Sequence, residues 1–321
     1  MDITRNLILK IRTGSQLYGT DTPDSDEDYV GIFHKPMEYL LGLNNIEQID
    51  LGLKSKTEEG KNAPDAIDYT AYTLEKFCTL AMDNNPNILE LLFVNPENII
   101  YRNGYGKALL NLRNSFLSMN IKHRFLGYAF SQRHKMIVKL ENYDLMTLAR
   151  DKLVEIVDKI PQGYMKYIYE CIDYYLFKDE KTGHYIRVGD INLPRNTNVR
   201  KALEILNQRI SKFGHRTELI SKYGYDTKFA SHLIRLLLEG IELLETSNLV
   251  FPLQDAKLLK DIKQGEYTLE MILKMADTYE QYIEKLFLKN PLPHKPDFNK
   301  INEFVIDTNF NELTRPIQSS V

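Results

Sequence analysis

The chain has 321 residues, of which 43% are hydrophobic and 26% are charged, and this composition is that of a globular protein with room for two domains. No apolar run approaches the roughly 20 residues that a membrane-spanning helix needs. Charged residues at four of the first twelve positions disfavour a signal peptide. The two cysteines have no spacing typical of a disulfide framework or a zinc site, and the net charge of −3 excludes a uniformly basic protein. We therefore expect a cytoplasmic protein without a membrane partner.

The first predicted element is a strand or short helix over residues 7–11, which leads into a turn at Gly14 and Ser15. Glycine has no Cβ, so the backbone at Gly14 is able to approach a ligand closely. Ser15 places a hydroxyl at the expected start of a short helix, where free backbone N–H groups and the helix dipole favour a phosphate. The turn is thus a candidate contact for the phosphates of a nucleotide.

An acidic segment follows, because residues 21–28 contain five acidic residues and no basic one, as a metal site would. Asp26 and Asp28 are two positions apart where the predicted strand 29–33 begins, so we expect both side chains on one face. A third carboxylate, Asp68, lies in the predicted strand 67–69. Three carboxylates suit two Mg²⁺ ions around a nucleoside triphosphate, one activating the attacking hydroxyl and one stabilising the leaving pyrophosphate. The pattern predicts nucleotidyl transfer.

Other interpretations of this segment compete. It has the 1-3-5 carboxylate spacing of a calcium loop, but such a loop needs Gly at its sixth position and Glu at its twelfth, where this chain has Tyr29 and Lys35. Thr-Pro-Asp-Ser-Asp is also typical of a solvated structural turn. Asp65 competes with Asp68 as the third carboxylate.

The later elements are predicted from hydrophobic periodicity. A short helix over residues 36–41 and a strand over 46–51 precede Asp68, and the period becomes helical from residue 70. Asn85 and Pro86 predict an N-cap followed by proline at the first helical position. Beyond Gly104 almost everything is predicted to be helical, apart from a small strand over 184–188 and an extended tail from Pro291 onward. The predicted helices span residues 87–93, 105–118, 120–142, 147–159, 162–177, 196–213, 226–246 and 268–288.

Two of these helices carry a narrow polar stripe, whose members recur at three- and four-residue steps and therefore share a face. We expect the stripes to line a cleft, with the cations on phosphates and the tyrosine against a base, although ordinary solvated helix faces give the same pattern. The stripe residues are Lys228, His232 and Arg235 in the helix 226–246, and Arg124 and Tyr128 in the helix 120–142. Asn87 and Glu90 are further candidates for contact with the acceptor or a base, and capping or solvent exposure would explain them equally well.

The charge is unevenly distributed along the chain. Residues 200–235 contain eight Lys or Arg against three acidic residues, and residues 121–135 contain four against none. Basic stretches beside an acidic metal centre suit a polyanionic substrate, whether a nucleoside triphosphate or a nucleic acid.

The acidic motif and the turn before it resemble the DNA polymerase β superfamily of nucleotidyltransferases. Residues 14–31 read Gly-Ser-x-x-Tyr-Gly-Thr-x-Thr-Pro-Asp-Ser-Asp-x-Asp-Tyr-x-Gly, which is similar to one branch, the predicted nucleotidyltransferases of RNA-repair pathways that also occur in phages. The similarity continues through residues 85–93, 123–128 and 228–237. It departs at Glu27, where the superfamily more often has an apolar residue. The resemblance implies that Ser15 contacts phosphates and that Asp26, Asp28 and Asp68 form the catalytic, metal-binding triad. The expected nucleotide-binding residues are Gly14, Ser15, Tyr18, Lys228, His232 and Arg235.

We therefore predict an α+β fold, in which a small mixed-sheet nucleotidyltransferase core over residues 1–118 precedes a mainly helical, cleft-closing domain over residues 119–321. The expected reaction moves a nucleoside monophosphate from a triphosphate to a hydroxyl at an RNA end, in RNA repair or tRNA 3′-end processing, and releases pyrophosphate. It would use two Mg²⁺ ions, for which Mn²⁺ could substitute. Transfer to a small molecule or a protein side chain is the alternative, and a nucleotide-binding protein without turnover is a third hypothesis. The sequence contains no recognisable RNA-binding module and does not determine the acceptor, the nucleotide or the oligomeric state.

Overall fold

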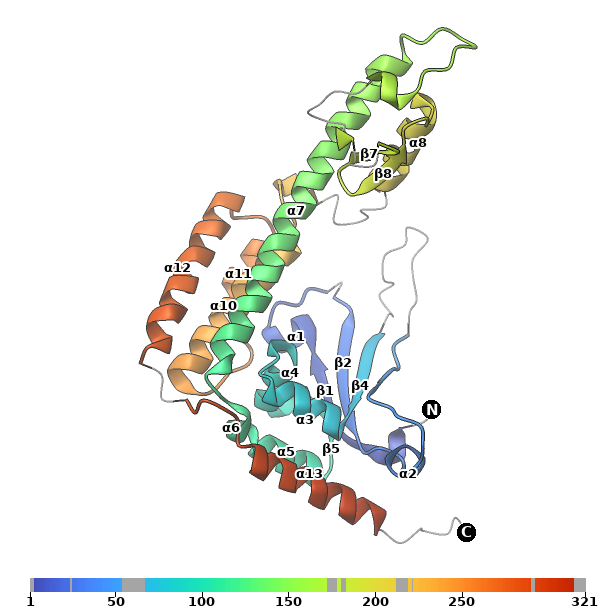
Figure 1. The fold of residues 1–321 in the computed structure, drawn as a ribbon. Coiled ribbons are helices and arrows are strands. Elements are labelled where there is room, and N and C mark those ends of the chain that lie inside the picture. Colours follow the sequence, from blue (N-terminus) through green and yellow to red (C-terminus); the bar gives the residue numbers. More distant parts are fainter. Residues whose placement is uncertain are drawn as a thin grey trace. The chain divides into compact units, whose positions relative to one another are not determined.

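The protein consists of two compact units. Figure 1 labels the helices and strands and colours the chain from the N-terminus to the C-terminus. Unit 1 comprises residues 1–130 together with residues 231–321, and unit 2 comprises residues 131–230. The structure is a computed structural model that describes residues 3–23, 25–53, 67–171, 178–179, 183–211, 219–220, 222–289 and 292–314. No helix in this described part of the chain is long and apolar enough to cross a membrane.

A mixed five-stranded sheet forms the centre of unit 1, with the strand order β3-β4-β2-β1-β5. The pairing of β2 with β4 is parallel, and the other three pairings are antiparallel. The strands are β1 (Leu7–Thr13), β2 (Glu27–Phe33), β3 (Gln48–Asp50), β4 (Ile67–Thr73) and β5 (Ile99–Arg102). The sheet confirms the predicted fold class and the four predicted strands. The fifth strand, β5, was not predicted, because a four-residue run carries too little periodicity to be distinguished from a loop.

Several helices of unit 1 begin at a side chain that caps them. Thr73 accepts a hydrogen bond from the backbone N–H of Lys76 (3.3 Å) at the start of α3, and Asn85 accepts one from the N–H of Asn87 (3.1 Å) before Pro86, as predicted. The 3₁₀ helix η2 (Glu90–Phe93) continues α4. The helices are α1 (Gly14–Tyr18), α2 (Met37–Leu40), α3 (Leu74–Met82), α4 (Pro86–Leu89), α5 (Gly104–Asn111), α6 (Arg113–Phe116), the first residues of α7 (Asn120–Val157), most of α10 (Thr227–Thr246), α11 (Ala256–Lys263), α12 (Leu269–Phe287) and α13 (Phe298–Leu313).

The predicted extended tail is wrong for residues 298–313, which form α13. Asp297 caps this helix by accepting from the N–H of Lys300 (3.2 Å), and Ile301 and Thr308, seven residues apart, are its buried residues. Asn309 donates to Glu75 of α3 (2.9 Å). Only two positions of α13 are buried, so the apolar pattern is too sparse to predict a helix from periodicity alone. Residues 315–321 lie outside the described residues.

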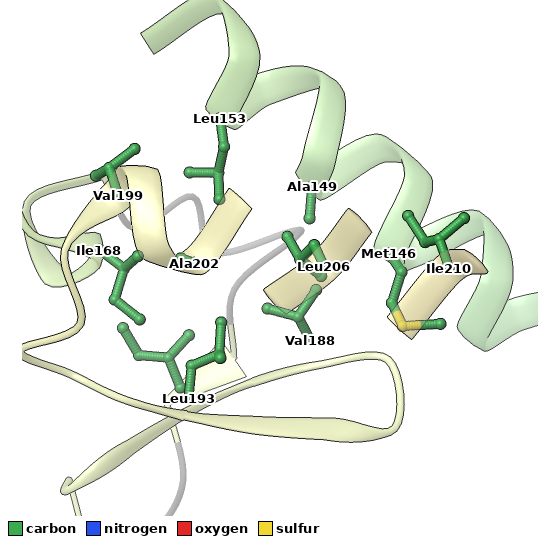
Figure 2. Packing of buried hydrophobic residues seen from close by; sticks show 11 residues of the cluster. Met146, Ala149, Leu153, Ile168, Val188, Leu193, Val199, Ala202, Leu206 and Ile210 are labelled. Carbon is green, nitrogen blue, oxygen red and sulfur yellow. The ribbon is translucent and has the colours of Figure 1, made fainter. Parts of the chain in front are cut away.

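Unit 2 packs the rest of α7 and the helix α8 (Val199–Ser211) against a three-stranded antiparallel sheet. The strands are β6 (Lys178–Asp179), β7 (Tyr185–Val188) and β8 (Ile191–Pro194). Figure 2 shows the core, to which α7 contributes Met146, Ala149 and Leu153. The buried residues of α8 are Val199, Ala202, Leu206 and Ile210, whose spacing gives the helix one apolar face.

Three of the predicted helices need correction. The segments 120–142 and 147–159 form the single helix α7, because residues 143–146 contain neither glycine nor proline to interrupt it. The predicted helix 162–177 is wrong for its described part, where only Ile168–Cys171 is helical, as a 3₁₀ turn. Residues 172–177 lie outside the described residues.

The two compact units differ from the expected division at residue 118. Residues 231–321 group with the N-terminal residues because they make tertiary contacts there, such as the hydrogen bond from Arg235 to Glu90 (2.6 Å) and the backbone hydrogen bond from the N–H of Asp297 to the carbonyl of Ser115 (2.8 Å). Contacts between segments this far apart in sequence leave no local signal.

Candidate active site

Three carboxylates meet at one end of the parallel strand pair β2–β4. The register pairs Asp28 of β2 with Asp68 of β4, and Asp26 lies immediately before the first residue of β2. One carboxylate oxygen from each of the three residues lies within 4.8 Å of the others. Asp26 and Asp28 are half-buried and Asp68 is exposed. The structure therefore brings together the three residues predicted as the metal site, whereas the competing Asp65 lies outside the described residues.

The cluster is electrostatically unfavourable without a cation. Burial raises the pKa of Asp28 to about 6, and the neighbouring charges of Asp26 and Asp68 contribute to the rise. Lys263 opposes it. Carboxylate oxygens are the ligands that Mg²⁺ prefers, and a divalent ion would offset the mutual repulsion. The donor set thus fits a divalent metal.

Gly14 lies directly against this cluster. Its φ of +66° is in the left-handed region, and a Cβ added there would lie 1.9 Å from Oδ2 of Asp28. Any larger residue would therefore displace the carboxylate as well as strain the backbone. Ser15 follows in α1 and is half-buried. The predicted phosphate turn and the predicted metal ligands are adjacent in the structure.

A buried polar network connects the C-terminal residue of α1 to α10. The Tyr18 hydroxyl donates to Glu90 (2.7 Å), and the guanidinium of Arg235, 4.1 Å from the centre of the Tyr18 ring, donates to Glu90 (2.6 Å) and to Glu239 (2.8 Å). Arg235, Glu90 and Glu239 are 6%, 1% and 0% exposed. Burial raises the pKa of Glu239 to about 8. Arg235 also donates to Asn87 (3.3 Å). Four predicted site residues, Tyr18, Asn87, Glu90 and Arg235, are therefore hydrogen-bonded to one another. Contact of each with the nucleotide or the acceptor stays a prediction.

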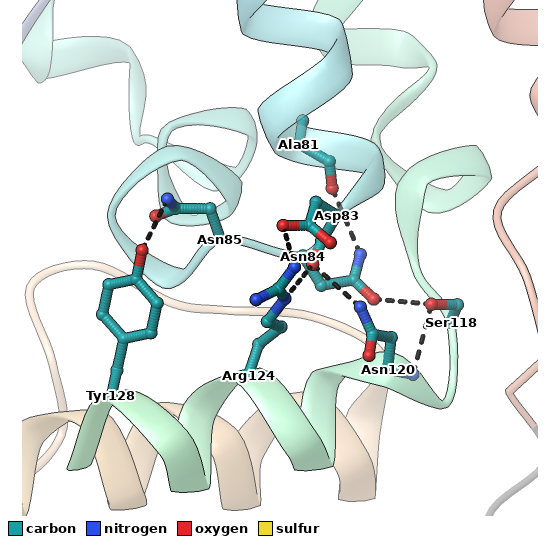
Figure 3. A network of polar contacts seen from close by, with 8 residues as sticks. All are labelled: Ala81, Asp83, Asn84, Asn85, Ser118, Asn120, Arg124 and Tyr128. Atoms are coloured by element: carbon teal, nitrogen blue, oxygen red, sulfur yellow. Dashed lines mark hydrogen bonds and ion pairs between the residues drawn. The ribbon is translucent and has the colours of Figure 1, made fainter. Parts of the chain in front are cut away.

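The other two residues of the α10 stripe differ in exposure. Lys228 is exposed and His232, four residues later on the same helix, is half-buried, and contact with a phosphate stays a prediction for both. Figure 3 shows that Arg124 and Tyr128 of α7 both reach the loop between α3 and α4. Arg124 donates to the carbonyl of Asp83 (3.2 Å) and forms an ion pair with its carboxylate, and Asn85 donates to the Tyr128 hydroxyl (2.8 Å). These contacts attach α7 to the loop, and contact with an acceptor stays a prediction.

Lys263 is a candidate site residue that the sequence did not reveal. It is the last residue of α11, and its Nζ donates to Oγ1 of Thr20 (2.9 Å), next to the motif. It also lowers the pKa of Asp28 electrostatically. The segment before α11 brings it there, because Leu253 donates to the carbonyl of Tyr18 (3.3 Å). No spacing rule links residue 263 to a motif at residues 14–31, so only the fold could identify it.

Comparison with known proteins supports the resemblance. The sequence matches the family described as RNA repair pathway DNA polymerase beta family over residues 2–307. It is similar to a protein of Enterobacteria phage T4, described as an uncharacterized 38.9 kDa protein in the nrdC-mobD intergenic region, with 27% identity over 327 residues that cover 93% of this chain and 95% of the phage protein. The crystal structure of a nucleotidyltransferase-like protein from Exiguobacterium sibiricum aligns with 98% of this chain and 78% of its own, at 9% identity and a TM-score of 0.26, which is too low to carry an argument.

Proposed function

This chain belongs to the RNA repair pathway DNA polymerase beta family, and we propose that it transfers a nucleoside monophosphate from a nucleoside triphosphate to a hydroxyl at an RNA end. The observation that carries the proposal is the cluster of Asp26, Asp28 and Asp68 within 4.8 Å, beside the glycine-serine turn. The choice of RNA as acceptor is supported by the description of the family alone.

Asp26, Asp28 and Asp68 would hold the metal. Two Mg²⁺ ions, or Mn²⁺ in their place, would supply Lewis-acid stabilisation of the attacking oxygen and of the pyrophosphate leaving group. In the reaction a bond forms between the acceptor oxygen and the α-phosphorus, and the bond from that phosphorus to pyrophosphate breaks. Asp68 is the exposed member of the cluster. We propose that it accepts the proton of the attacking hydroxyl or bridges that hydroxyl to the metal.

The phosphates would bind along the turn. Gly14 leaves space next to Asp28 that a side chain would fill. The Ser15 hydroxyl would donate to a phosphate oxygen, and the Lys263 ammonium, which acts electrostatically on Asp28, would stabilise the negative charge of the triphosphate.

The test is to incubate the protein with each α-labelled nucleoside triphosphate, Mg²⁺ and a pool of short RNAs, and to identify the labelled product. We expect label on RNA with the wild type and with Asp21→Asn, which removes an exposed carboxylate of the same acidic segment. We expect no transfer by a folded Asp26→Asn, Asp28→Asn double variant. Transfer by that double variant would show that the metal site is misassigned. Label on the protein itself or on an added small molecule would replace RNA with the alternative acceptor.

A further inference from the structure

A cavity of about 440 Å³ lies within unit 2, and its lining contains none of the residues assigned to the reaction under the proposed function. Its wall combines the cations Lys135, Lys139 and Arg209 with the aromatic ring of Phe229 and the amide of Asn142. Cations for a backbone, a ring for stacking and an amide for a base edge are the groups that single-stranded nucleic acids require. The volume is within the range of sites for small ligands, so it is large enough for a nucleotide unit.

The charge of unit 2 has the sign that a polyanion needs. Residues 131–230 contain 18 Lys or Arg and 13 Asp or Glu, a net charge of +5, whereas the rest of the chain contains 23 and 31, a net charge of −8. The catalytic carboxylates therefore belong to the acidic unit and the cavity to the basic one. A basic surface attracts nucleic acid from solution and holds it through its phosphates.

The internal contacts of the cavity hold its binding groups in position. Buried Asp226 accepts hydrogen bonds from the backbone N–H of Phe229 (3.2 Å) at the start of α10, and it forms an ion pair with Lys139 (3.4 Å). The Nζ of Lys139 lies 5.6 Å from the centre of the Phe229 ring. Across the cavity wall, Arg209 makes two hydrogen bonds to the carboxylate of Asp190. Lys135 is exposed and makes no ion pair with the described residues, so its charge is available to a ligand.

We propose that this cavity binds a nucleotide of the single-stranded RNA acceptor, with a phosphate on Lys135 and a base stacked on Phe229. The proposal rests on the proposed function only in taking RNA as the acceptor. A single strand is specified because stacking on a side chain requires an unpaired, unstacked base.

The test measures binding alone, with a fluorescent 12-nucleotide single-stranded RNA in EDTA and without triphosphate, over a series of salt concentrations. We expect Lys135→Gln to reduce the slope of log affinity against log salt by about 0.7, because one phosphate contact is lost. Phe229→Leu should weaken binding about 5- to 150-fold with an unchanged slope, because stacking is lost without a change of charge. Lys152→Gln, an equal change at an exposed position of α7 outside the cavity, should bind as the wild type does.

The proposal would be overturned if the wild type bound no RNA at low salt, or if Lys135→Gln left the salt slope unaltered. It would also be overturned by equal affinity for a duplex of the same sequence, or by free ATP that displaced the RNA with an affinity similar to that of the RNA. The last result would assign the cavity to a mononucleotide instead of RNA. A thermal melt shows whether Phe229→Leu is folded. If it is not, the salt dependence of RNA binding by Lys135→Gln tests the proposal, because Lys135 is exposed and its substitution does not disturb the core. If nucleotidyl transfer fails in its own assay, this binding result still stands, because no chemistry occurs in it.

Discussion

At the residue scale, Gly14 and Asp28 depend on each other. The left-handed φ of Gly14 and the 1.9 Å approach of its missing Cβ to the Asp28 carboxylate make glycine necessary for two separate reasons. The same close packing removes solvent from Asp28 and so raises its pKa. The carboxylate is thus positioned for a cation at the expense of stability in the metal-free protein.

This cost predicts the behaviour of Asp28→Asn, which keeps the shape of the side chain and removes its charge. In EDTA the variant should melt at a higher temperature than the wild type, because repulsion by Asp26 and Asp68 is relieved. Mg²⁺ should raise the melting temperature of the wild type, by linkage to binding, and raise that of the variant much less. Differential scanning fluorimetry measures both, with Asp21→Asn as the control. A variant less stable than the wild type in EDTA would contradict the repulsion.

Lys263 gives a second prediction at this scale. If its ammonium contacts the triphosphate, Lys263→Met should raise the KM for nucleotide by about 10- to 150-fold, which corresponds to the roughly 1.5–3 kcal/mol of a hydrogen bond to a charged group. Lys257→Met, at an exposed position of the same helix, should leave the KM unchanged. Steady-state kinetics on both variants test this. Equal kinetics of the two variants would show that Lys263 only supports Thr20.

At the scale of elements, the network around Arg235 holds α1 against η2 and α10. One guanidinium is shared by two buried carboxylates, Glu90 and Glu239, and it covers the ring of Tyr18. Since Tyr18 ends the helix that begins with Gly14 and Ser15, the position of the turn depends on this network. Of the stripe predicted on α10, Arg235 is therefore bonded to a neighbouring element within the protein, whereas Lys228 is exposed.

The network predicts a large loss of stability for Arg235→Met. Removing the cation leaves Glu239 without its hydrogen-bond donor and Glu90 with only the Tyr18 hydroxyl, and breaking a buried ion pair in this way typically costs about 3–5 kcal/mol. Adding Glu239→Gln to Arg235→Met should recover part of this loss, because a neutral amide at this buried position needs neither a counter-ion nor the uptake of a proton on folding. Urea unfolding of the two single variants and the double variant measures the coupling. Near-normal stability of Arg235→Met together with a raised nucleotide KM would instead favour the original prediction that Arg235 grips a phosphate.

At the scale of the whole molecule, the charges are separated between the two units. The carboxylate cluster lies in the unit of net charge −8, and the cation-lined cavity lies in the unit of net charge +5. A single acidic surface would repel RNA, and a single basic one would not concentrate metal ions. Because the acidic and the basic residues are concentrated in different units, the proposed binding of metal ions and the proposed binding of RNA are compatible in one chain.

The sequence by itself determined the family and the fold class, and it predicted Asp26 and Asp28 as metal ligands while leaving Asp65 open beside Asp68 as the third carboxylate. These follow from short-range patterns: the two-residue spacing of Asp26 and Asp28, the glycine-serine turn, and the apolar strands around Asp68. Only the tertiary structure decided that Asp28 and Asp68 are neighbours in a parallel register, that Lys263 lies near them and that Arg235 is enclosed by glutamates. The physical reason is that periodicity and turn chemistry act within a few residues, whereas these contacts join segments up to 243 residues apart. Hydrophobic burial brings such segments together, and because it is non-directional, it leaves no local pattern that names the partner.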